Sequence, residues 1–268
     1  MQFIKSLFKL LFFICPAFAT AQSTFLTPGS KDVHFVDRME IKQQRNTDLN
    51  FSAVRPFNRK YIVEQVEFID SARLGYIDTA TQKDKYVEWN SQGLTDLDEY
   101  NLTSFLMNNS EWVTGPKKDF LSKRPFLKTF YKTKPNFLEV KTRNFFLAVN
   151  PVFQYVQGIE TGYSKPIYLN SKGVTLRGTI GKKIGFSTYL TDNQERGPQF
   201  FQQQVNYFRA VPGVGFYKPF KTSGYDYFDA RGYITVRAGN AIDVQFGYDK
   251  NFIGNRYRSL FLSDWGNS

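Results

Sequence analysis

Apolar and polar residues alternate with a period of two in the second half of the chain, from about residue 141 onward. The clearest runs are 174–180 and 242–249, and weaker runs occur at 186–191 and 233–238. A fifth run, 145–156, is longer and more apolar. Successive side chains of a strand point to opposite faces, so this period predicts five antiparallel β-strands. In the two clearest runs, one face of the predicted strand is polar.

Short and long connections alternate between these strands. Three-residue turns join two of the pairs, with the sequences Gly181-Lys182-Lys183 and Gly239-Asn240-Ala241. The other connections are long: 157–173, 191–229 and everything after residue 250. A soluble β-sandwich also alternates, but short turns on one side and long loops on the other are typical of an outer-membrane barrel. The pattern therefore favours a barrel.

The front of the chain has a different period. Ile62, Val66 and Ile69 share one face at helical spacing and predict an amphipathic helix over 61–73. A capping-box pattern from Thr95 to Asp98 predicts a second helix that continues to about residue 109. Residues 22–141 are thus predicted to form a helical or mixed periplasmic region, and residues 142–268 the first strands of the barrel.

The first 21 residues have the three parts of a secretory signal peptide. Lys5 and Lys9 precede the apolar stretch 10–18, and Ala19-Thr20-Ala21 provides a cleavage site after Ala21. A lipoprotein anchor on Cys15 is the alternative, but Phe12-Phe13-Ile14 lacks the small residue expected before a lipidated cysteine. No later stretch is apolar for long enough to form a membrane helix, so membrane insertion would use strands.

These patterns predict a mainly β protein, an antiparallel outer-membrane β-barrel preceded by a small helical region. Five strands cannot close a barrel, which needs about eight. The last residues, Asp264-Trp265-Gly266-Asn267-Ser268, also lack the terminal aromatic strand of a complete barrel. We therefore expect an incomplete barrel, the N-terminal part of a longer protein.

The formal charge is +11, and removal of Lys5 and Lys9 leaves +9 (11 minus 2). Export disfavours nucleic acid as the partner of a basic chain and favours an acidic surface polysaccharide or lipopolysaccharide. The aromatic content of 18% fits the aromatic girdles of a barrel surrounded by outer-membrane lipid. Because the only cysteine leaves with the signal peptide, disulfides and thiolate metal sites are excluded.

Catalytic signals are weak. His34 is the only histidine, and no G-x-S-x-G motif accompanies it. Carboxylate pairs occur at Asp96 and Asp98 and at Asp226 and Asp229, but the first pair is explained as helix-cap charges and nothing supports the second. The sequence therefore predicts a protein that is not an enzyme, with no catalytic residues, no cofactor and no metal.

Two basic and aromatic segments are candidates for glycan binding, because arginine grips carboxylates and tyrosine stacks on sugars. One is Arg256-Tyr257-Arg258, whose arginines could instead pair with lumen carboxylates. The other is the aromatic-rich segment 192–229, which could instead be a plug or a cap; its candidates are Arg196, Arg209, Tyr217 and Lys218. The residues predicted to face the lumen are Arg177, Arg237, Asp243, Gln245 and Asp249.

Three stretches, 55–59, 177–186 and above all 246–264, resemble the Wzi-type capsule-assembly proteins of Bacteroidota and their RemB-like gliding-motility relatives. The segment from Gly254 to Asp264 is the most specific. The resemblance implies an outer-membrane barrel with a helical periplasmic portion that helps attach capsular polysaccharide. Two alternatives stay open: a gliding or adhesion component whose region 61–109 docks a periplasmic envelope protein, and a diffusion channel.

Overall fold

The computed structural model describes residues 23–27, 29–43, 56–73, 94–115, 120–181, 183–238, 242–253, 258–260 and 266. The predicted signal peptide and its cleavage site lie outside these residues. No helix in the described parts is long and apolar enough to cross a membrane.

The described residues form helices and one β-sheet. The helices are α2 (Lys31–Gln43), α3 (Arg59–Arg73), α4 (Asp96–Asn108) and α5 (Gln199–Phe208). The strands are β1 (Leu138–Lys141), β2 (Phe145–Gly158), β3 (Ile167–Ile180), β4 (Ile184–Arg196), β5 (Lys218–Phe220), β6 (Gly224–Ala238) and β7 (Ile242–Tyr248).

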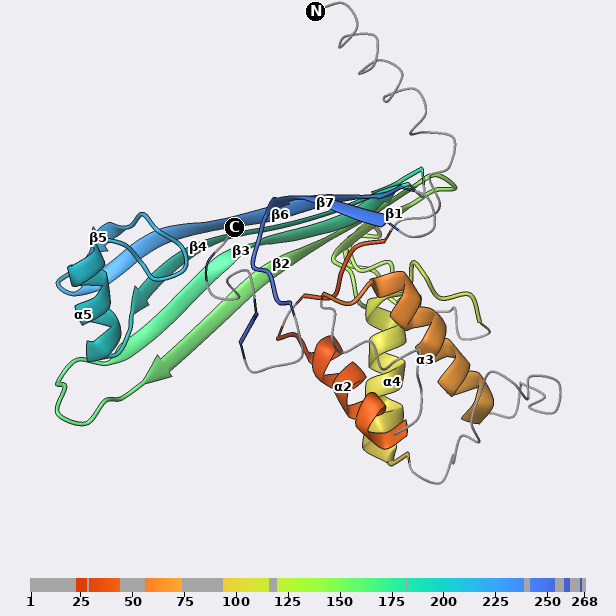
Figure 1. The fold of residues 1–268 in the computed structure, drawn as a ribbon, viewed down its shortest axis with the longest axis horizontal. Helices are drawn as coiled ribbons and strands as arrows, with labels where there is room; N and C mark the ends of the chain where they lie inside the picture. Colours follow the sequence, from red (N-terminus) through yellow and green to blue (C-terminus); the bar gives the residue numbers. More distant parts are fainter. Residues whose placement is uncertain are drawn as a thin grey trace, which may run out of the picture.

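All seven of these strands belong to one antiparallel sheet in the order β1-β2-β3-β4-β6-β5, and β7 also pairs with β6. Helices α2, α3 and α4 lie together at one end of the long strands, and α5 lies at the opposite end (Figure 1). The prediction of a mainly antiparallel β fold with a helical front part is confirmed at this level. The sheet is open: within the described residues β1 forms one edge, and β5 and β7 the other.

The three front helices form a helical unit with its own core. Both predicted helices are present as α3 and α4, whereas α2 was not predicted from the sequence. Thr95 caps α4 through the predicted capping box with Asp98. The largest fully buried apolar side chains of this core are Leu26, Val36, Met39, Val63, Val66, Ile69, Leu102, Phe105 and Leu106.

Asp98 joins two of these helices. Its side chain is fully buried and accepts hydrogen bonds from Arg38 Nε at 2.5 Å, from the Lys42 ammonium and from Thr95 N at 2.9 Å. Burial alone would raise the pKa of this carboxyl, but the hydrogen bonds from Arg38, Lys42 and Thr95 outweigh it and hold the pKa well below its ordinary value. The carboxylate therefore ties α2 to the start of α4.

The strand register gives the sheet two different faces, since residues paired across antiparallel strands point the same way. One face, called the inner face, is mainly polar in its central part; its members there include Asn150, Thr175, Arg177, Ser187, Tyr189, Thr191, Arg231, Tyr233, Thr235 and Gln245. The outer face is mainly apolar over the same part of the sheet; its apolar members include Leu147, Val149, Phe153, Val174, Leu176, Phe186, Leu190, Phe228, Ile234, Val244 and Phe246. Lys172 and Asp192 interrupt the row that contains Phe153 and Phe228.

Burial on the two faces is the reverse of that in a water-soluble sheet. Thr235 on the inner face is fully buried, whereas its neighbour Ile234 is 51% exposed and Phe246, which pairs with Ile234, is 82% exposed. The inner face also buries Ser171, Thr179, Thr191, Asn193 and Asp229. Several polar side chains of the inner face are thus covered by protein, whereas Ile234 and Phe246 of the outer face are exposed.

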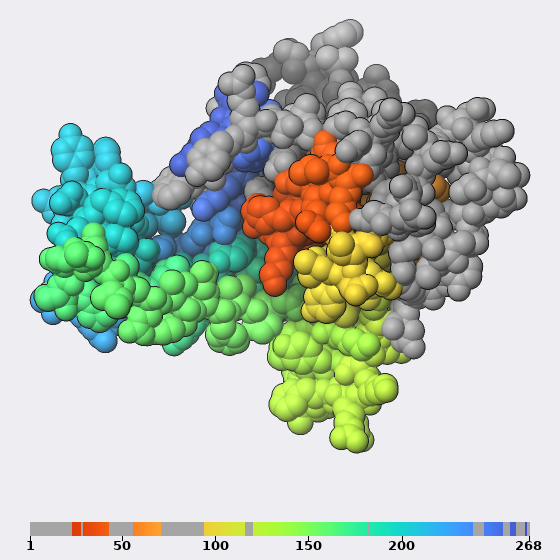
Figure 2. Space-filling model, turned by 90° about the horizontal axis from the view of Figure 1, so that it is seen from below, coloured from red at the N-terminus to blue at the C-terminus, as the bar shows by residue number. Residues whose placement is uncertain are grey.

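Residues 23–27, called the strap here, connect the helical unit to the inner face. Tyr233 Oη accepts a hydrogen bond from Phe25 N at 3.0 Å, and Thr235 Oγ1 donates to the Ser23 carbonyl at 3.1 Å. A Cβ at Gly185 would come within 2.9 Å of that carbonyl, so the close approach requires glycine. In the space-filling view α2 and α4 lie at the end of the strands opposite α5 (Figure 2).

On the other side of the strap lies Arg59, at the start of α3. Its guanidinium donates to Thr24 Oγ1 at 3.2 Å, to the Phe25 carbonyl at 3.1 Å and to the Asn109 side chain. Burial lowers the pKa of Arg59, while Asp32 nearby partly restores it. The strap is therefore hydrogen-bonded on both sides.

The connections differ from the sequence prediction. The segment 191–229 is not one long loop, because β4 continues to Arg196, α5 and β5 follow, and β6 already begins at Gly224. The connection between β2 and β3, predicted at 157–173, comprises only residues 159–166. Residues 138–141, predicted to belong to the helical region, form β1 and pair with β2.

Replacing the buried carboxylate tests the helical unit. We expect Asp98→Asn to lower the free energy of unfolding by about 1–3 kcal/mol at neutral pH, because a cap and two charged hydrogen bonds are lost. The folded pKa of Asp98 lies below its unfolded value of about 3.9, so this stabilisation is complete above that pH and is lost as the pH falls further.

Urea unfolding of the full chain in detergent, followed by helical circular dichroism, measures the effect. Asp96→Asn is the control, since Asp96 is an exposed carboxylate in the same helical turn. An equal loss of unfolding free energy in both variants would contradict the role of Asp98. So would a difference in unfolding free energy between Asp98→Asn and the parent that stays the same in acid.

Candidate functional site

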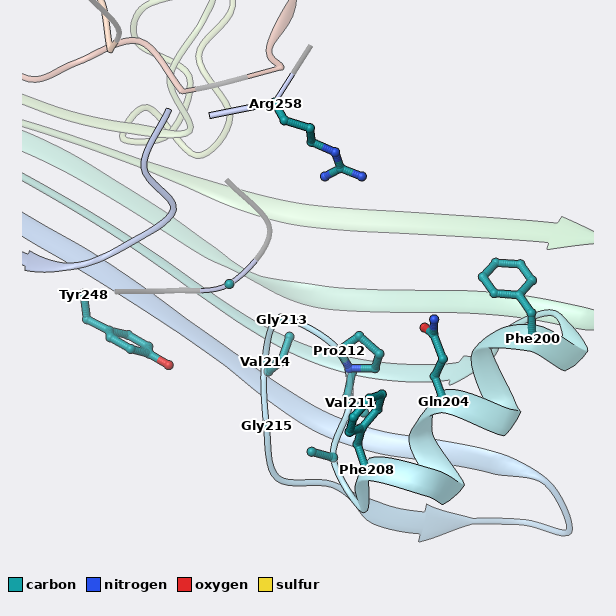
Figure 3. A pocket seen from close by; sticks show the side chains of 12 residues that line it. Phe200, Gln204, Phe208, Val211, Pro212, Gly213, Val214, Gly215, Tyr248 and Arg258 are labelled. Carbon is teal, nitrogen blue, oxygen red and sulfur yellow. The ribbon is translucent and has the colours of Figure 1, made fainter. Parts of the chain in front are cut away.

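A groove of about 720 Å³ lies beside α5, at the end of the strands opposite the helical unit. It is lined by Phe200, Gln204, Phe208, Ala210, Val211, Pro212, Gly213, Val214, Gly215, Tyr248, Arg258 and Gly266 (Figure 3). The lining combines aromatic rings with an amide and a guanidinium. Such a surface suits a ligand that has both ring faces and polar substituents.

Helix α5 presents two stripes to two different surroundings. Phe200, Gln204 and Phe208 recur every four residues and therefore share the face that lines the groove. Phe201 and Val205 form the second stripe and pack against the sheet, where Val205 is fully buried. The helix thus shields its second stripe and leaves Phe200 and Phe208 exposed at 62% and 66%.

Aromatic side chains of the sheet hold α5 in place. Tyr225, buried on the inner face, meets the Phe201 ring edge-on at 5.9 Å and the Tyr217 ring at 5.1 Å. Its hydroxyl donates to the Gln202 carbonyl at 3.4 Å. These contacts place α5 over the end of the inner face.

The loop between β2 and β3 supports the start of the helix. The Glu160 carboxylate accepts a hydrogen bond from Gln199 N at 2.9 Å and so satisfies a free N–H group of the first turn. Tyr163 exchanges hydrogen bonds with the Gln202 side chain at 3.2–3.3 Å. Residues 159–166 are therefore a structural support of the groove.

The predicted glycan-binding residues separate into three groups. Arg258 lines the groove, whereas Arg256 and Tyr257 lie outside the described residues. Two others have structural surroundings: Tyr217 packs on Tyr225, and Arg196 is buried over the Tyr168 ring at 5.2 Å and donates to the Pro166 carbonyl.

Arg209 and Lys218 fall in the third group, close to the groove in sequence but not part of its lining. Arg209 ends α5 in a left-handed conformation with φ 54°, and Lys218 begins β5 with an exposed side chain. Sequence reasoning did not single out Phe200, Gln204 and Phe208 as site residues. Their four-residue spacing was the available signal, but the segment was interpreted as a loop.

A second, smaller cavity of about 260 Å³ lies between the strap and the inner face. Its wall includes Arg59, Arg177, Arg231, Tyr189, Tyr233, Gln245 and Asp249. Among the residues predicted to face a lumen, Arg177 and Gln245 line this cavity together with Asp249. Arg237 pairs in register with Asp243 further along the same face.

The cations of this cavity already have partners. Arg177 is paired with Glu111 and donates to the Asn108 carbonyl at 2.7 Å, so it fastens the helical unit to β3. Arg231 stacks over the Tyr189 ring at 4.2 Å and lies 3.2 Å from Asp229 and 3.6 Å from Asp249. This cavity therefore has the character of a structural interface, and the α5 groove is the better candidate site.

No group of metal-ligating side chains occurs among the residues that the structure describes. Comparison with known proteins found no match for the chain among family models, curated proteins or solved structures.

Proposed function

We propose that the sheet is part of an outer-membrane β-barrel of the Wzi type, and that the protein holds an acidic surface polysaccharide at the cell surface without catalysing a reaction. The outer face would contact lipid hydrocarbon. The α5 groove would contact the glycan.

The observation that carries the membrane part of this proposal is the reversed burial of the two faces. Ile234, Val244 and Phe246 are at least half exposed, while Thr235 between them is fully buried. A water-soluble sheet would expose the threonine and bury the others, because about 25 cal/mol is lost per Å² of apolar surface left in water. Lipid tails remove that cost and explain the arrangement.

The extent of the apolar surface agrees with a bilayer. On β2 it extends from Phe145 to Phe153 and on β6 from Phe228 to Val236, whereas on β3 and β4 it ends at Val174 and Leu190, because Lys172 and Asp192 follow on the outer face. Nine residues span about 27 Å along a strand, or about 20 Å of height at the usual tilt, compared with the roughly 25 Å band of known barrels. Tyr155, which is 68% exposed, continues the outer face beside this surface with a ring suited to a membrane interface.

The glycan part of the proposal rests on the groove. Phe200 and Phe208 offer exposed ring faces for stacking on sugars, and Arg258 brings a cation to the same groove. The groove lies at the end of the sheet opposite the helical unit. If the helical unit is periplasmic, this end reaches the outside of the cell.

A second candidate function, as part of gliding or adhesion machinery, has one observation in its favour. The helical unit exposes Ile41 at 74%, Leu97 at 60% and Tyr100 at 71%, large apolar side chains suited to a protein partner. The diffusion-channel alternative has less support, because Arg177 on the inner face is occupied by the helical unit.

Deleting the gene separates the first two functions. We expect mutant cells to release their surface polysaccharide into the medium while they still spread on agar, since attachment alone depends on the groove. Extracted cell-bound and free polysaccharide are measured beside the spreading diameter. Normal retention together with lost spreading would replace the polysaccharide function by the motility function.

A charge on the outer face tests the membrane part. Phe246→Arg places a cation in the proposed lipid contact, where it costs about 2–4 kcal/mol near the bilayer centre. We expect the variant to insert poorly into phosphatidylcholine vesicles, measured by flotation and by heat-dependent mobility in gels. Gln245→Arg, one residue away on the inner face, is the matched control and should insert as the parent does. Equal insertion of the two variants would rule out lipid contact at Phe246.

Removing one ring tests the groove. We expect Phe208→Ala to weaken binding of the full chain to polysaccharide extracted from the producing cells by about tenfold, equivalent to about 1.4 kcal/mol. The measurement is biolayer interferometry in detergent, with neutral dextran as the reference polymer. Phe216→Ala is the matched control, because Phe216 is an aromatic residue 97% exposed that does not line the groove. Equal effects of both substitutions would exclude the groove as the binding site.

A further inference from the structure

Two adjacent turns lie at the end of the sheet nearest the helical unit. The first connects β1 to β2 and is closed by a hydrogen bond from Thr142 N to the Phe145 carbonyl at 2.8 Å. The second connects β3 to β4 and contains Gly181, whose φ of +59° favours glycine. Gly181 N donates to the Asn144 carbonyl at 2.6 Å, so the two turns are side by side.

The turns carry cations and no acidic residue. Their sequences are Lys141-Thr142-Arg143-Asn144 and Gly181-Lys182-Lys183. The side chains of Lys141, Arg143 and Lys183 are exposed, and these three residues are called the basic rim here. The nearest carboxylate along the chain from the first turn, Glu139, accepts hydrogen bonds from Thr133 and Asn136. The two turns thus carry positive charge and no carboxylate of their own.

The basic rim borders the apolar outer face directly. The last apolar row of that face contains Phe145, Ile180, Ile184, Val236 and Val244. Lys183 is one residue from Ile184, and Arg143 is two residues from Phe145, so these two cations lie within about 10 Å of the row. Lys141 ends β1 and pairs in register with Phe146, so it lies at the same end of the sheet but on the inner-face side. The apolar surface of the outer face therefore ends at this row, and the basic rim follows it directly.

The opposite end of the strands also carries charge. The loop 159–166 contains one acid, Glu160, and one base, Lys165, whereas the connection 197–223 contains Arg209, Lys218 and Lys221 and no acid. On the outer face Lys172 pairs in register with Asp192. The basic rim differs from that connection because it directly follows the last apolar row, whereas the polar ends of the strands separate the connection 197–223 from the apolar surface.

We infer that the basic rim binds anionic phospholipid headgroups of the leaflet nearest the helical unit. The inference rests on the proposed membrane location of the outer face. Lysine and arginine next to a hydrocarbon surface reach the phosphate layer with their charged ends while their stems stay apolar. The side chains of the rim are exposed at the turns, so the rim suits headgroups presented in a plane.

Spin-labelled lipids measure this preference on the reconstituted full chain. In phosphatidylcholine vesicles, the lipids held at the protein surface give a motionally restricted signal. We expect spin-labelled phosphatidylglycerol to be enriched in that signal about threefold over labelled phosphatidylcholine. The enrichment should disappear in the triple variant Lys141→Gln, Arg143→Gln, Lys183→Gln, and in about 1 M salt, where the screening length is about 3 Å.

A control variant removes the same charge elsewhere. Lys31→Gln, Lys132→Gln and Lys218→Gln neutralise three exposed cations away from the two turns and should keep the enrichment. No enrichment in the parent, or an equal loss in the control, overturns the rim as a lipid site. A restricted signal without preference for phosphatidylglycerol leaves the membrane proposal standing, whereas no restricted signal with either lipid overturns both.

Discussion

The structure depends on one constraint, the in-register alternation of polar and apolar side chains across β2, β3, β4, β6 and β7. A slip of one residue in any strand would move its apolar set to the inner face. The register therefore decides on which face each side chain lies. Side chains of the inner face contact protein or water, and those of the outer face form a mainly apolar surface.

The inner face explains why the helical unit is attached to the sheet. Buried hydroxyl and guanidinium groups are costly unless they are hydrogen-bonded. The strap supplies such partners to Tyr233 and Thr235, and Glu111 supplies one to Arg177. Arg59 then binds the strap from the other side. Helices and sheet are thus linked through polar contacts, in contrast to the apolar core within the helical unit.

Much of this fold could be predicted where local patterns are strong. The capping box of α4 is a local hydrogen-bond pattern, and the central part of each long strand alternates clearly. The ends of β3 and β4 furthest from the helical unit were not predicted as strands, because polar residues occur on both faces there. The paired residues Asn170 and Gln194 are an example. Without a difference between faces, sequence alone could not distinguish strand from loop.

The site was harder to predict because its residues come together only through tertiary structure. Arg258 was singled out and lines the groove, but Arg196 and Tyr217 have the same residue types and serve packing. What separates them is burial: Arg196 is 9% exposed, whereas Phe208 is 66% exposed. Spacing along the chain carries no information about that difference.

The two ends of the strands then acquire different roles for a physical reason. Beyond the last apolar positions, Phe153 on β2 and Leu190 on β4, the strands continue for five and six residues with mostly polar outer side chains. That length corresponds to about 17–20 Å. It would carry the α5 groove clear of a bilayer and into water, where a hydrated polymer can reach it. At the other end the apolar row meets the basic rim within one or two residues, so that end would lie in the headgroup layer itself.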